Sequence, residues 1–365
     1  MREFSQRSRI VIKIGTHCLS AGNTVDSSFI HDISRQISGL LETHRVLIVS
    51  SGAIGMGAGD IGITERVTSV ALRQACAAIG QPLLMQEYRQ AFAEVGVQVA
   101  QVLLTADVLA NRRSYLNLRN SVETLLSLGV VPIFNENDSV ATDEIGSAFG
   151  DNDTLSAYIA SKVDADLLLM LSDIDALYDD DPRKNQEAKP YRTVKTITSS
   201  IEKKAGKAGS TFAAGGMATK IQAVKIARKA GCQVIIVDGR EKNIIERVLA
   251  GEEVGTLFLA EPRMSARERW ILNSRPAGSI VIDDGALKAI RSKKSLLPSG
   301  VVSVSGVFSE GDVILANDTV KMVTAFNSSQ LESILGKHSS EIASILGGGK
   351  KEVIARPEDM VFLDR

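Results

Sequence analysis

The chain has 365 residues, which is enough for two domains, and 44% of them are hydrophobic, as in a globular protein with a proper core. Its 42 basic and 43 acidic residues leave a formal net charge of −1, so charge gives no support for binding to nucleic acid or to a membrane surface. The three cysteines, Cys18, Cys76 and Cys232, lack C-x-x-C spacing and indicate neither a zinc site nor a disulfide framework. Because no leader-like N-terminus and no apolar run of ~20 residues is visible, we expect a cytoplasmic protein without a membrane span.

The first predicted strand, residues 9–14, contains a lysine among β-branched residues. The run Ile10-Val11-Ile12 is typical of a strand buried on both faces of a parallel sheet. Lys13 interrupts this run, because an ammonium group is almost never buried without a partner. Gly15 follows at a turn where the backbone can approach a ligand. Lys13 either meets an anion at the carboxyl end of the sheet or extends its stem out of an edge strand, and these residues leave both interpretations open.

Strands and helices alternate along the first two thirds of the chain. Apolar residues from Phe29 to Leu41 recur at helical spacing. Buried strands are predicted, with helical patterns between them, at residues 45–49, 97–104, 130–134, 167–171 and 233–237. This alternation predicts βαβ units, and therefore an α/β fold with a mainly parallel sheet sandwiched by helices.

The pattern changes near residue 262, where turn-forming residues become frequent. Short β-type runs follow, separated by glycine-containing turns, at 280–282, 301–304, 313–315 and 321–323. A predicted helix at 328–346 interrupts them. We therefore predict a first domain at 1–262, a linker at 263–274 and a second domain, a small β-barrel or sandwich, at 275–365.

Two common nucleotide-binding motifs do not explain the chain. No G-x-x-x-x-G-K-[ST] occurs, which excludes a P-loop protein. Residues 57–62 match G-x-G-x-x-G, but the match begins well after its strand and lacks an acidic residue about 20 positions on, so we interpret it as a coincidence and disfavour a nicotinamide dehydrogenase. The loop from Ser50 to Gly59 still offers backbone N–H groups and a helix N-terminus to an anion, although tight strand–helix packing would also need its glycines.

Two polar clusters lie close together in the sequence. Asn135-Glu136-Asn137-Asp138 follows the predicted strand 130–134, and Gly150-Asp151-Asn152-Asp153 opens a predicted helix. Asp151 or Asn152 could simply cap that helix. Capping alone explains two such clusters poorly, and they could hold an ammonium group, metal-bound water or a catalytic lysine. We interpret the acidic run 179–181, in contrast, as a solvated loop.

A second lysine lies near the start of another predicted helix. Gly215-Gly216 at that helix N-terminus would form a phosphate-sized concavity. Lys220 would lie in the first turn, where a cation opposes the helix dipole unless an anion occupies the site. The alternative is a surface lysine on a helix that also carries Lys225 and Lys229.

In this order, the stretches resemble the amino acid kinase family, and within it the enzymes that phosphorylate glutamate. The matching pieces are residues 11–16, 50–54, 135–138, 150–153, 177–178 with 181–183, 215–217 with 219–220, and 254–258. Residues from about 277 to 360 resemble a PUA domain. The resemblance implies an amino acid kinase fold followed by a small β-rich, PUA-like barrel.

The resemblance also implies an activity. It implies transfer of the γ-phosphoryl group of ATP, with Mg²⁺, to the side-chain carboxylate of L-glutamate, which gives glutamyl 5-phosphate at the first step of proline synthesis. A glutamate carboxylate has a reference pKa of ~4.3 and is already ionised at neutral pH, so it needs no general base. Phosphoryl transfer mainly requires positioning and charge neutralisation, which lysines, Mg²⁺ and helix N-termini supply.

The resemblance assigns roles to individual residues. It places Lys13 and Lys220 on the transferring phosphoryl group, with Asp153 orienting both lysines. Its glutamate-binding positions match Ser51, Gly52, Asp138 and Asn152. Its ATP-binding positions match Lys13, Gly15, Ser172, Asp173, Ala214, Gly215, Gly216, Met217, Ala218, Thr219 and Lys220. It implies no metal ligand from the protein, since ATP phosphates and water can hold Mg²⁺.

Two stretches depart from the family pattern. Ala213-Ala214 removes a hydroxyl near the nucleotide, and Ala176 replaces a usual glycine.

A related kinase acting on N-acetylglutamate or aspartate is the close alternative to a kinase acting on glutamate. An RNA-binding PUA protein is the distant one, but residues 275–365 hold 11 basic and 11 acidic residues and only three aromatic ones, which disfavours a nucleic-acid surface.

The resemblance extends to partners. It implies proline as a feedback inhibitor, glutamyl phosphate reductase as a partner enzyme, and a homodimer or homotetramer.

Overall fold

The computed structural model divides the chain into two compact units, Met1–Arg263 and Met264–Arg365, each with its own core. The residues that the structure describes are 2, 4, 8–21, 24–65, 67–105, 108–109, 111–140, 152–182, 184–202, 216–262, 265–337, 339–347 and 352–363.

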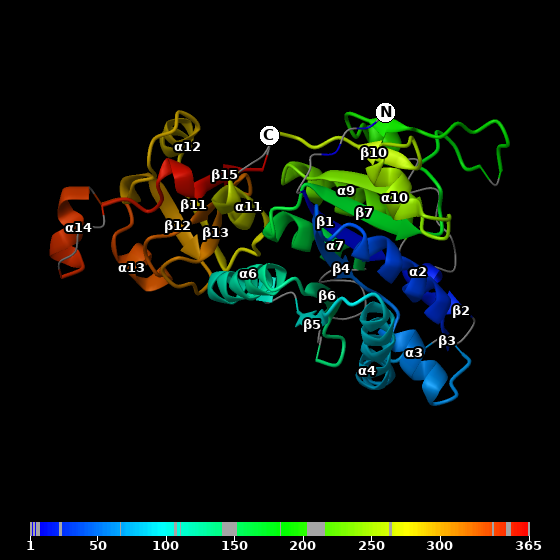
Figure 1. Cartoon of the computed structure of the whole chain (residues 1–365). Coiled ribbons are helices and arrows are strands. Elements are labelled where there is room, and N and C mark those ends of the chain that lie inside the picture. Colours follow the sequence, from blue (N-terminus) through cyan, green and yellow to red (C-terminus); the bar gives the residue numbers. More distant parts are fainter. Residues whose placement is uncertain are drawn as a thin grey trace. The chain divides into compact units, whose positions relative to one another are not determined.

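An eight-stranded sheet forms the centre of the first unit (Figure 1). Its strands are, in spatial order, β5 (Val99–Leu104), β6 (Val131–Glu136), β4 (Arg45–Val49), β1 (Arg9–Ile14), β7 (Leu167–Ser172), β9 (Gln233–Asp238), β10 (Thr256–Phe258) and β8 (Thr193–Val194). From β5 to β9 every pairing is parallel, and β10 runs antiparallel to β9. The predicted mainly parallel sheet is therefore confirmed, with an antiparallel pairing near one edge.

Helices cover both faces of this sheet. On one face Ile10, Ile12 and Ile14 share a core with helices α2 (Ser27–Ser38), α4 (Val70–Glu94) and α10 (Ile244–Leu249). On the other face Val11 shares a core with α6 (Arg112–Ser127), α7 (Asn152–Lys162) and α9 (Met217–Lys229). Because side chains alternate along a strand, Lys13 lies on the face of Val11, which α7 and α9 cover. β1 is also a central strand, so Lys13 cannot extend from an edge.

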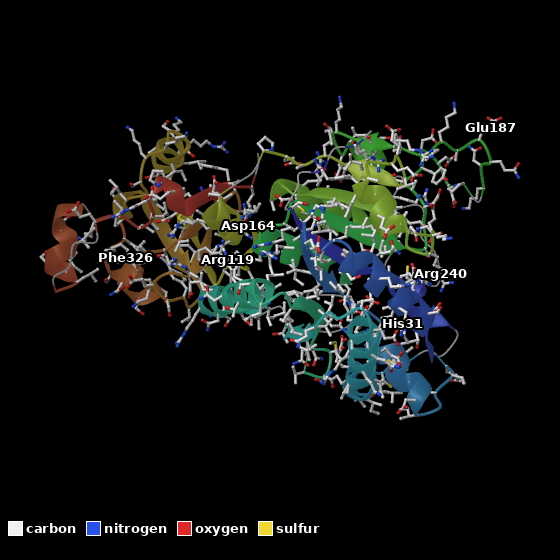
Figure 2. All side chains as sticks on the ribbon, in the orientation of Figure 1. His31, Arg119, Asp164, Glu187, Arg240 and Phe326 are labelled. Atoms are coloured by element: carbon white, nitrogen blue, oxygen red, sulfur yellow. The ribbon has the colours of Figure 1, made fainter. Side chains whose placement is uncertain are left out.

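Helix α6 is tied to the end of α7 by an ion pair. Arg119 Nη2 lies 3.2 Å from Asp164 Oδ2, just beyond the last turn of α7 (Figure 2). Both side chains are partly exposed, so this pair contributes little stability by itself.

Two glycines let helix α3 (Ala53–Asp60) cross α4 in backbone contact. A Cβ atom added to Gly57 would lie 1.9 Å from the carbonyl oxygen of Cys76, and one added to Gly80 would lie 1.9 Å from that of Ala53. Gly57, which lies in the stretch that matched G-x-G-x-x-G, therefore allows α3 to pack closely against α4. Gly52, which precedes α3, has a φ of 97°, a conformation that favours glycine.

Short elements complete the first unit. After β1 come the one-turn helix α1 (Thr16–Leu19) and a two-stranded ribbon of β2 (Ser20–Ala21) and β3 (Thr24–Val25).

The second unit is built on a separate five-stranded sheet. Its strands are, in order, β12 (Val301–Ser305), β11 (Gly278–Ile282), β13 (Val313–Ala316), β14 (Val320–Val323) and β15 (Met360–Phe362). Its helices are α11 (Ala266–Asn273), α12 (Asp284–Arg291), α13 (Ser328–Ser333) and α14 (Ser339–Ile345), with 3-10 turns at Pro298–Gly300 and Pro357–Asp359. Only the β11–β13 pairing is parallel among the described strands of this sheet.

The second unit differs from the sequence-based prediction in two places. The single helix predicted at 328–346 is wrong, because the chain turns between α13 and α14, where Gly336 adopts a φ of 67°. The segment predicted as a linker, 263–274, contains helix α11, which contacts β14 and β15. A reciprocal capping box between Ser265 and Glu268 starts this helix.

Within the part of the chain that the structure describes, we find no helix that is both long enough and apolar enough to cross a membrane.

Candidate active site

Two lysines bind the two oxygens of one buried carboxylate at the carboxyl end of β1. Lys13 Nζ lies 2.5 Å from Asp153 Oδ1, and Lys220 Nζ lies 3.1 Å from Asp153 Oδ2. The side chain of Asp153 is fully buried, and the two lysine side chains are 5% and 6% exposed. We call Lys13, Asp153 and Lys220 the lysine–aspartate trio.

The fold explains why these three residues meet. Lys13 points to the face of the sheet that α7 and α9 cover, since it shares that face with Val11. Asp153 lies in the first turn of α7, and Lys220 lies in the first turn of α9. Helices α7 and α9 pack against each other with their N-terminal turns near the carboxyl end of β1. Three separate elements thus contribute one charged side chain each.

The trio places two ammonium groups beside one carboxylate in a buried position. Burial by itself would raise the pKa of Asp153, but the ammonium groups of Lys13 and Lys220 hold that pKa below its ordinary value. Asp153 is therefore ionised at neutral pH. The two ammonium groups beside it could also stabilise a bound anion such as a phosphoryl group.

Thr219 borders the trio. Its Oγ1 lies 3.4 Å from Asp153 Oδ2, but its closer acceptor is the carbonyl oxygen of Gly216, at 2.8 Å. Thr219 thus mainly stabilises the first turn of α9.

Asn152, the neighbour of Asp153, connects α7 to the loop after β4. Its Nδ2 lies 2.6 Å from Ser50 O, 3.0 Å from Ser51 Oγ and 3.0 Å from Asn135 Oδ1. Two predicted glutamate-binding residues, Ser51 and Asn152, are therefore brought together. All three contacts use the amide nitrogen of Asn152 and join the start of α7 to the loop after β4 and to β6.

Asp138 lies just beyond β6 and is only partly buried. Burial raises its pKa, and the positive charge of Arg73 opposes that rise. Among the described residues, no hydrogen bond or ion pair connects Asp138 to Ser51 or Asn152.

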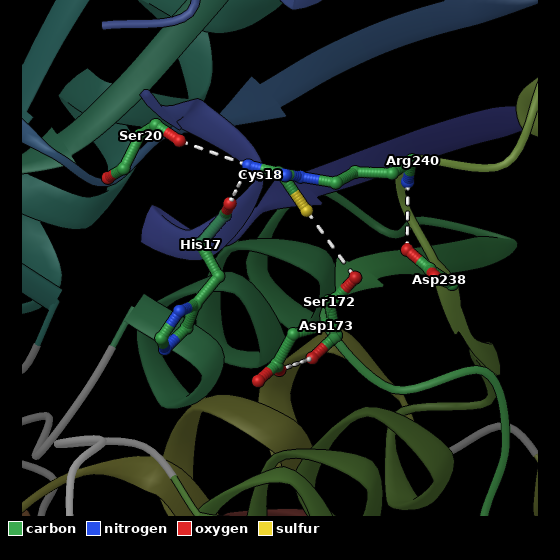
Figure 3. A pocket seen from close by; sticks show the side chains of 7 residues that line it. All are labelled: His17, Cys18, Ser20, Ser172, Asp173, Asp238 and Arg240. Atoms are coloured by element: carbon green, nitrogen blue, oxygen red, sulfur yellow. Dashed lines mark hydrogen bonds between the residues drawn. The ribbon is translucent and has the colours of Figure 1, made fainter. Parts of the chain in front are cut away.

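A pocket of about 340 Å³ opens beside the ends of β7 and β9 (Figure 3). Its lining residues are His17, Cys18, Ser20, Ser172, Asp173, Asp238 and Arg240. It includes both predicted ATP-binding residues at the end of β7, and Ser172 Oγ donates a hydrogen bond to Asp173 Oδ1 at 3.0 Å. Burial raises the pKa of Cys18 to about 11, so it stays a thiol at neutral pH.

Arg240 holds one wall of this pocket together. Its Nη2 donates to the carbonyl oxygens of His17, at 2.7 Å, and Ser20, at 3.0 Å (Figure 3). The turn that follows β1 is thereby joined to the turn that follows β9.

Gly15 begins the turn after β1 and packs closely against Leu171 of β7. Its N–H donates to the carbonyl oxygen of Leu171 at 3.1 Å. An added Cβ atom would lie 3.1 Å from that oxygen and 3.5 Å from Lys13 Nζ. Glycine therefore allows a close approach to the backbone of β7, which a side chain would crowd.

The predicted phosphate-binding turn is only partly described. Gly216 precedes α9, and Met217, Ala218 and Thr219 form its first turn. Ala213, Ala214 and Gly215 lie outside the described residues, as do Gly150 and Asp151. The acidic run at 179–181 behaves as a polar loop, since Asp179 and Asp180 accept hydrogen bonds from Lys189 and Asn185 nearby in the sequence.

Sequence reasoning missed three residues around the site. Gln81 of α4 accepts a hydrogen bond from Asn135, Tyr88 of α4 pairs with the Ser50 hydroxyl at 2.9 Å, and Arg240 closes the pocket wall. The available signal for Gln81 was its place as the one polar residue in the otherwise apolar run 75–85. No pattern in the sequence singled out Tyr88 or Arg240.

The fold and the trio together define a protein suited to phosphoryl transfer, and comparison with known proteins identifies its family. The model of the amino acid kinase family matches residues 8–238, and the model of the PUA domain matches residues 278–346. The chain therefore belongs to the amino acid kinase family.

Its relatives are similar over nearly their whole length. A glutamate 5-kinase of Methanosarcina barkeri is 44% identical over 371 residues, which cover 98% of this chain and 97% of the relative. A glutamate 5-kinase of Methanococcoides burtonii is 46% identical, over 93% of this chain and 92% of the relative. Among solved structures, the UMP kinase of Ureaplasma parvum aligns at 18% identity with a TM-score of 0.47, over 70% of this chain and 100% of that one.

Proposed function

We propose that this chain transfers the γ-phosphoryl group of ATP to the side-chain carboxylate of L-glutamate and so forms glutamyl 5-phosphate, the first step of proline biosynthesis. Relatives named glutamate 5-kinase match it over both of its domains. The observation that carries the chemistry is the lysine–aspartate trio, in which Lys13 and Lys220 bind opposite oxygens of Asp153.

In this proposal the lysine–aspartate trio stabilises negative charge and transfers no proton. An oxygen of the glutamate carboxylate attacks the γ-phosphorus, and the bond from that phosphorus to the bridging oxygen breaks, so that ADP leaves with the electron pair. No proton needs to be removed, because the nucleophile is already ionised. Lys13 and Lys220 stabilise the negative charge on the transferring group, and Asp153 holds both ammonium groups in place.

Glutamate lies, in this proposal, beside the ends of β4 and β6. Ser51 and Gly52 present a hydroxyl and backbone N–H groups to its carboxylates. Asp138 and the amide oxygen of Asn152 accept hydrogen bonds from its ammonium group. The hydrogen bond that joins Asn152 to Ser51, at 3.0 Å, supports a single shared site.

ATP lies on the other side of the trio, along Gly15, Ser172, Asp173 and the segment from Ala214 to Lys220. The pocket beside Ser172 and Asp173 supports this placement. In this proposal ATP phosphates and water hold Mg²⁺. When bound, Mg²⁺ neutralises charge on these phosphates.

The remaining assignments rest on the family alone. We propose that residues 1–262 form the kinase domain, that the enzyme works in the cytoplasm as a homodimer or homotetramer, and that proline inhibits it. Glutamyl phosphate reductase would take up the product.

Trapping of the acyl phosphate with hydroxylamine tests the activity. The purified chain is incubated with ATP and Mg²⁺ and with glutamate, N-acetylglutamate or aspartate in turn. We expect a hydroxamate with glutamate at a rate far above the other two. A higher rate with N-acetylglutamate or aspartate would assign the chain to the related carboxylate kinases instead.

A further inference from the structure

A chain of buried amides runs from helix α4 to the proposed glutamate site. Asn135 Nδ2 donates a hydrogen bond to Gln81 Oε1 at 2.8 Å. Asn135 Oδ1 accepts from Asn152 Nδ2 at 3.0 Å and from the Glu136 backbone N–H at 2.9 Å. Gln81 is 9% exposed and Asn135 is 2% exposed, so water does not readily replace these partners.

Partners on both sides fix the polarity of the Asn135 amide. Gln81 Oε1 accepts from its NH2 group, and the Glu136 backbone N–H donates to its oxygen, so the NH2 group lies toward α4 and the oxygen toward α7. Asn152 must then turn its NH2 group toward Asn135, where the oxygens of Ser50 and Ser51 also lie. If Asn135 were reversed, its NH2 group would face that of Asn152, and two donors would meet in a buried place.

This arrangement leaves the oxygen of Asn152 for a ligand. The three described partners of the Asn152 side chain all bind its nitrogen. An amide oxygen with a fixed direction is a good acceptor for the ammonium group of an amino acid. A freely turning Asn152 would offer that group a donor for part of the time.

Close backbone packing of α3 against α4 fixes the position of Gln81, the first residue in the chain of amides. Gly80, which precedes Gln81, and Gly57 of α3 lie so close that added Cβ atoms would meet backbone of the opposite helix at 1.9 Å. Helix α4 therefore has little freedom to shift at Gln81.

We propose that Gln81 is a positioning residue that sets substrate affinity through Asn135 and Asn152, without touching the substrate. This inference rests on the proposed function, because it takes glutamate as the ligand of Asn152. It predicts an effect on glutamate binding that is separate from ATP binding.

The test is a steady-state comparison of three full-length variants by hydroxamate formation. Gln81→Met removes the acceptor and keeps the side-chain length, whereas Gln81→Glu keeps an oxygen for Asn135. Gln36→Met is the matched control, because Gln36 is also a buried helix glutamine and accepts from the Ile245 backbone N–H at 2.9 Å, away from the site. If Gln81→Met does not fold, Gln81→Asn replaces it, since its shorter side chain cannot reach Asn135.

We expect Gln81→Met to raise the KM for glutamate about tenfold, the equivalent of ~1.4 kcal/mol, with the KM for ATP unchanged. Gln81→Glu should restore most of the affinity, and Gln36→Met should leave both KM values unchanged. The inference is overturned if folded Gln81→Met keeps the normal KM for glutamate, or if Gln36→Met raises it equally. An inactive wild type would instead overturn the proposed function.

Discussion

The ammonium group of Lys13 lies 2.5 Å from Asp153 Oδ1, in a place where the lysine is 5% exposed and the carboxylate is fully buried. Lys220 completes the contact from the other oxygen, at 3.1 Å. One carboxylate therefore fixes the distance and direction of two cations that come from different elements. Charged groups that are already held in place need not rearrange during phosphoryl transfer. Positioning and stabilisation of charge are the main requirements of that reaction.

Removal of either lysine should reduce turnover strongly. Lys13→Ala and Lys220→Ala each delete a charge on the transferring group, and we expect kcat to fall by about 10²–10³. The control is Lys225→Ala, also in α9, since Lys225 forms a partly exposed ion pair with Glu202. Hydroxamate formation measures all three rates. Near-normal turnover in both site variants would remove these lysines from the mechanism.

Asp153 should contribute stability that depends on pH. Its pKa is lowered in the folded state, so its contribution is fully present above its unfolded pKa of ~3.9 and is lost as the pH falls through the lower folded pKa. Asp153→Asn leaves two buried cations without their carboxylate, and we expect a loss of about 3–5 kcal/mol in the free energy of unfolding at pH 7.

Urea unfolding at a series of pH values checks this prediction. The difference between the wild type and Asp153→Asn should shrink as the pH falls below about 4. Glu202→Gln, in a partly exposed pair, should cost at most about 1 kcal/mol. A difference for Asp153→Asn that is constant down to low pH would mean that its charge is not what stabilises the fold.

The crossing of α3 and α4 should tolerate no side chain. Gly57→Ala or Gly80→Ala forces a Cβ atom into the opposite backbone, and we expect a loss of about 1–3 kcal/mol or more. Gly55→Ala in the same helix α3 meets nothing within 4 Å, so it should stabilise the chain by about 0.5–1 kcal/mol. Thermal unfolding distinguishes the cases, and equal effects at Gly55 and Gly57 would contradict the close crossing.

The second unit should be dispensable for the chemistry. Every described residue of the trio and of the proposed substrate sites lies in the first unit, which has its own cores. A chain that ends at Pro262 should keep a kcat within about threefold of the full-length value, a difference of less than 1 kcal/mol in the barrier. A shortened chain that shows cooperative unfolding but forms no hydroxamate would refute this expectation.

Local patterns in the sequence predicted much of the sheet and part of the site. Lys13 stood out because it breaks a run of β-branched residues, and Asn152 and Asp153 stood out because they open a helix beside a second polar cluster. These signals depend only on near neighbours and on the ends of strands. The ordered set of motifs, more than any single residue, linked them to one function.

Other features depend on residues far apart in the sequence. The contact of Lys13 and Lys220 with the same carboxylate results from the packing of α7 on α9 over β1, which no periodicity specifies. The role of Gln81 depends on a glycine crossing between two helices. The break between α13 and α14 was missed because glycine within a helical pattern can either remain helical or, as Gly336 does, turn to positive φ.

Transfer of oxygen from the substrate is the most direct test of glutamate as the phosphoryl acceptor. Glutamate labelled with oxygen-18 in its side-chain carboxylate is incubated with the enzyme, ATP and Mg²⁺, and the product is trapped with hydroxylamine. Hydroxylamine attacks the acyl carbon, so the released phosphate keeps the oxygen that joined carbon to phosphorus. We expect each phosphate formed during turnover to carry one oxygen-18 atom by mass spectrometry. Phosphate without the label, released at the same rate with or without glutamate, would contradict the proposed reaction.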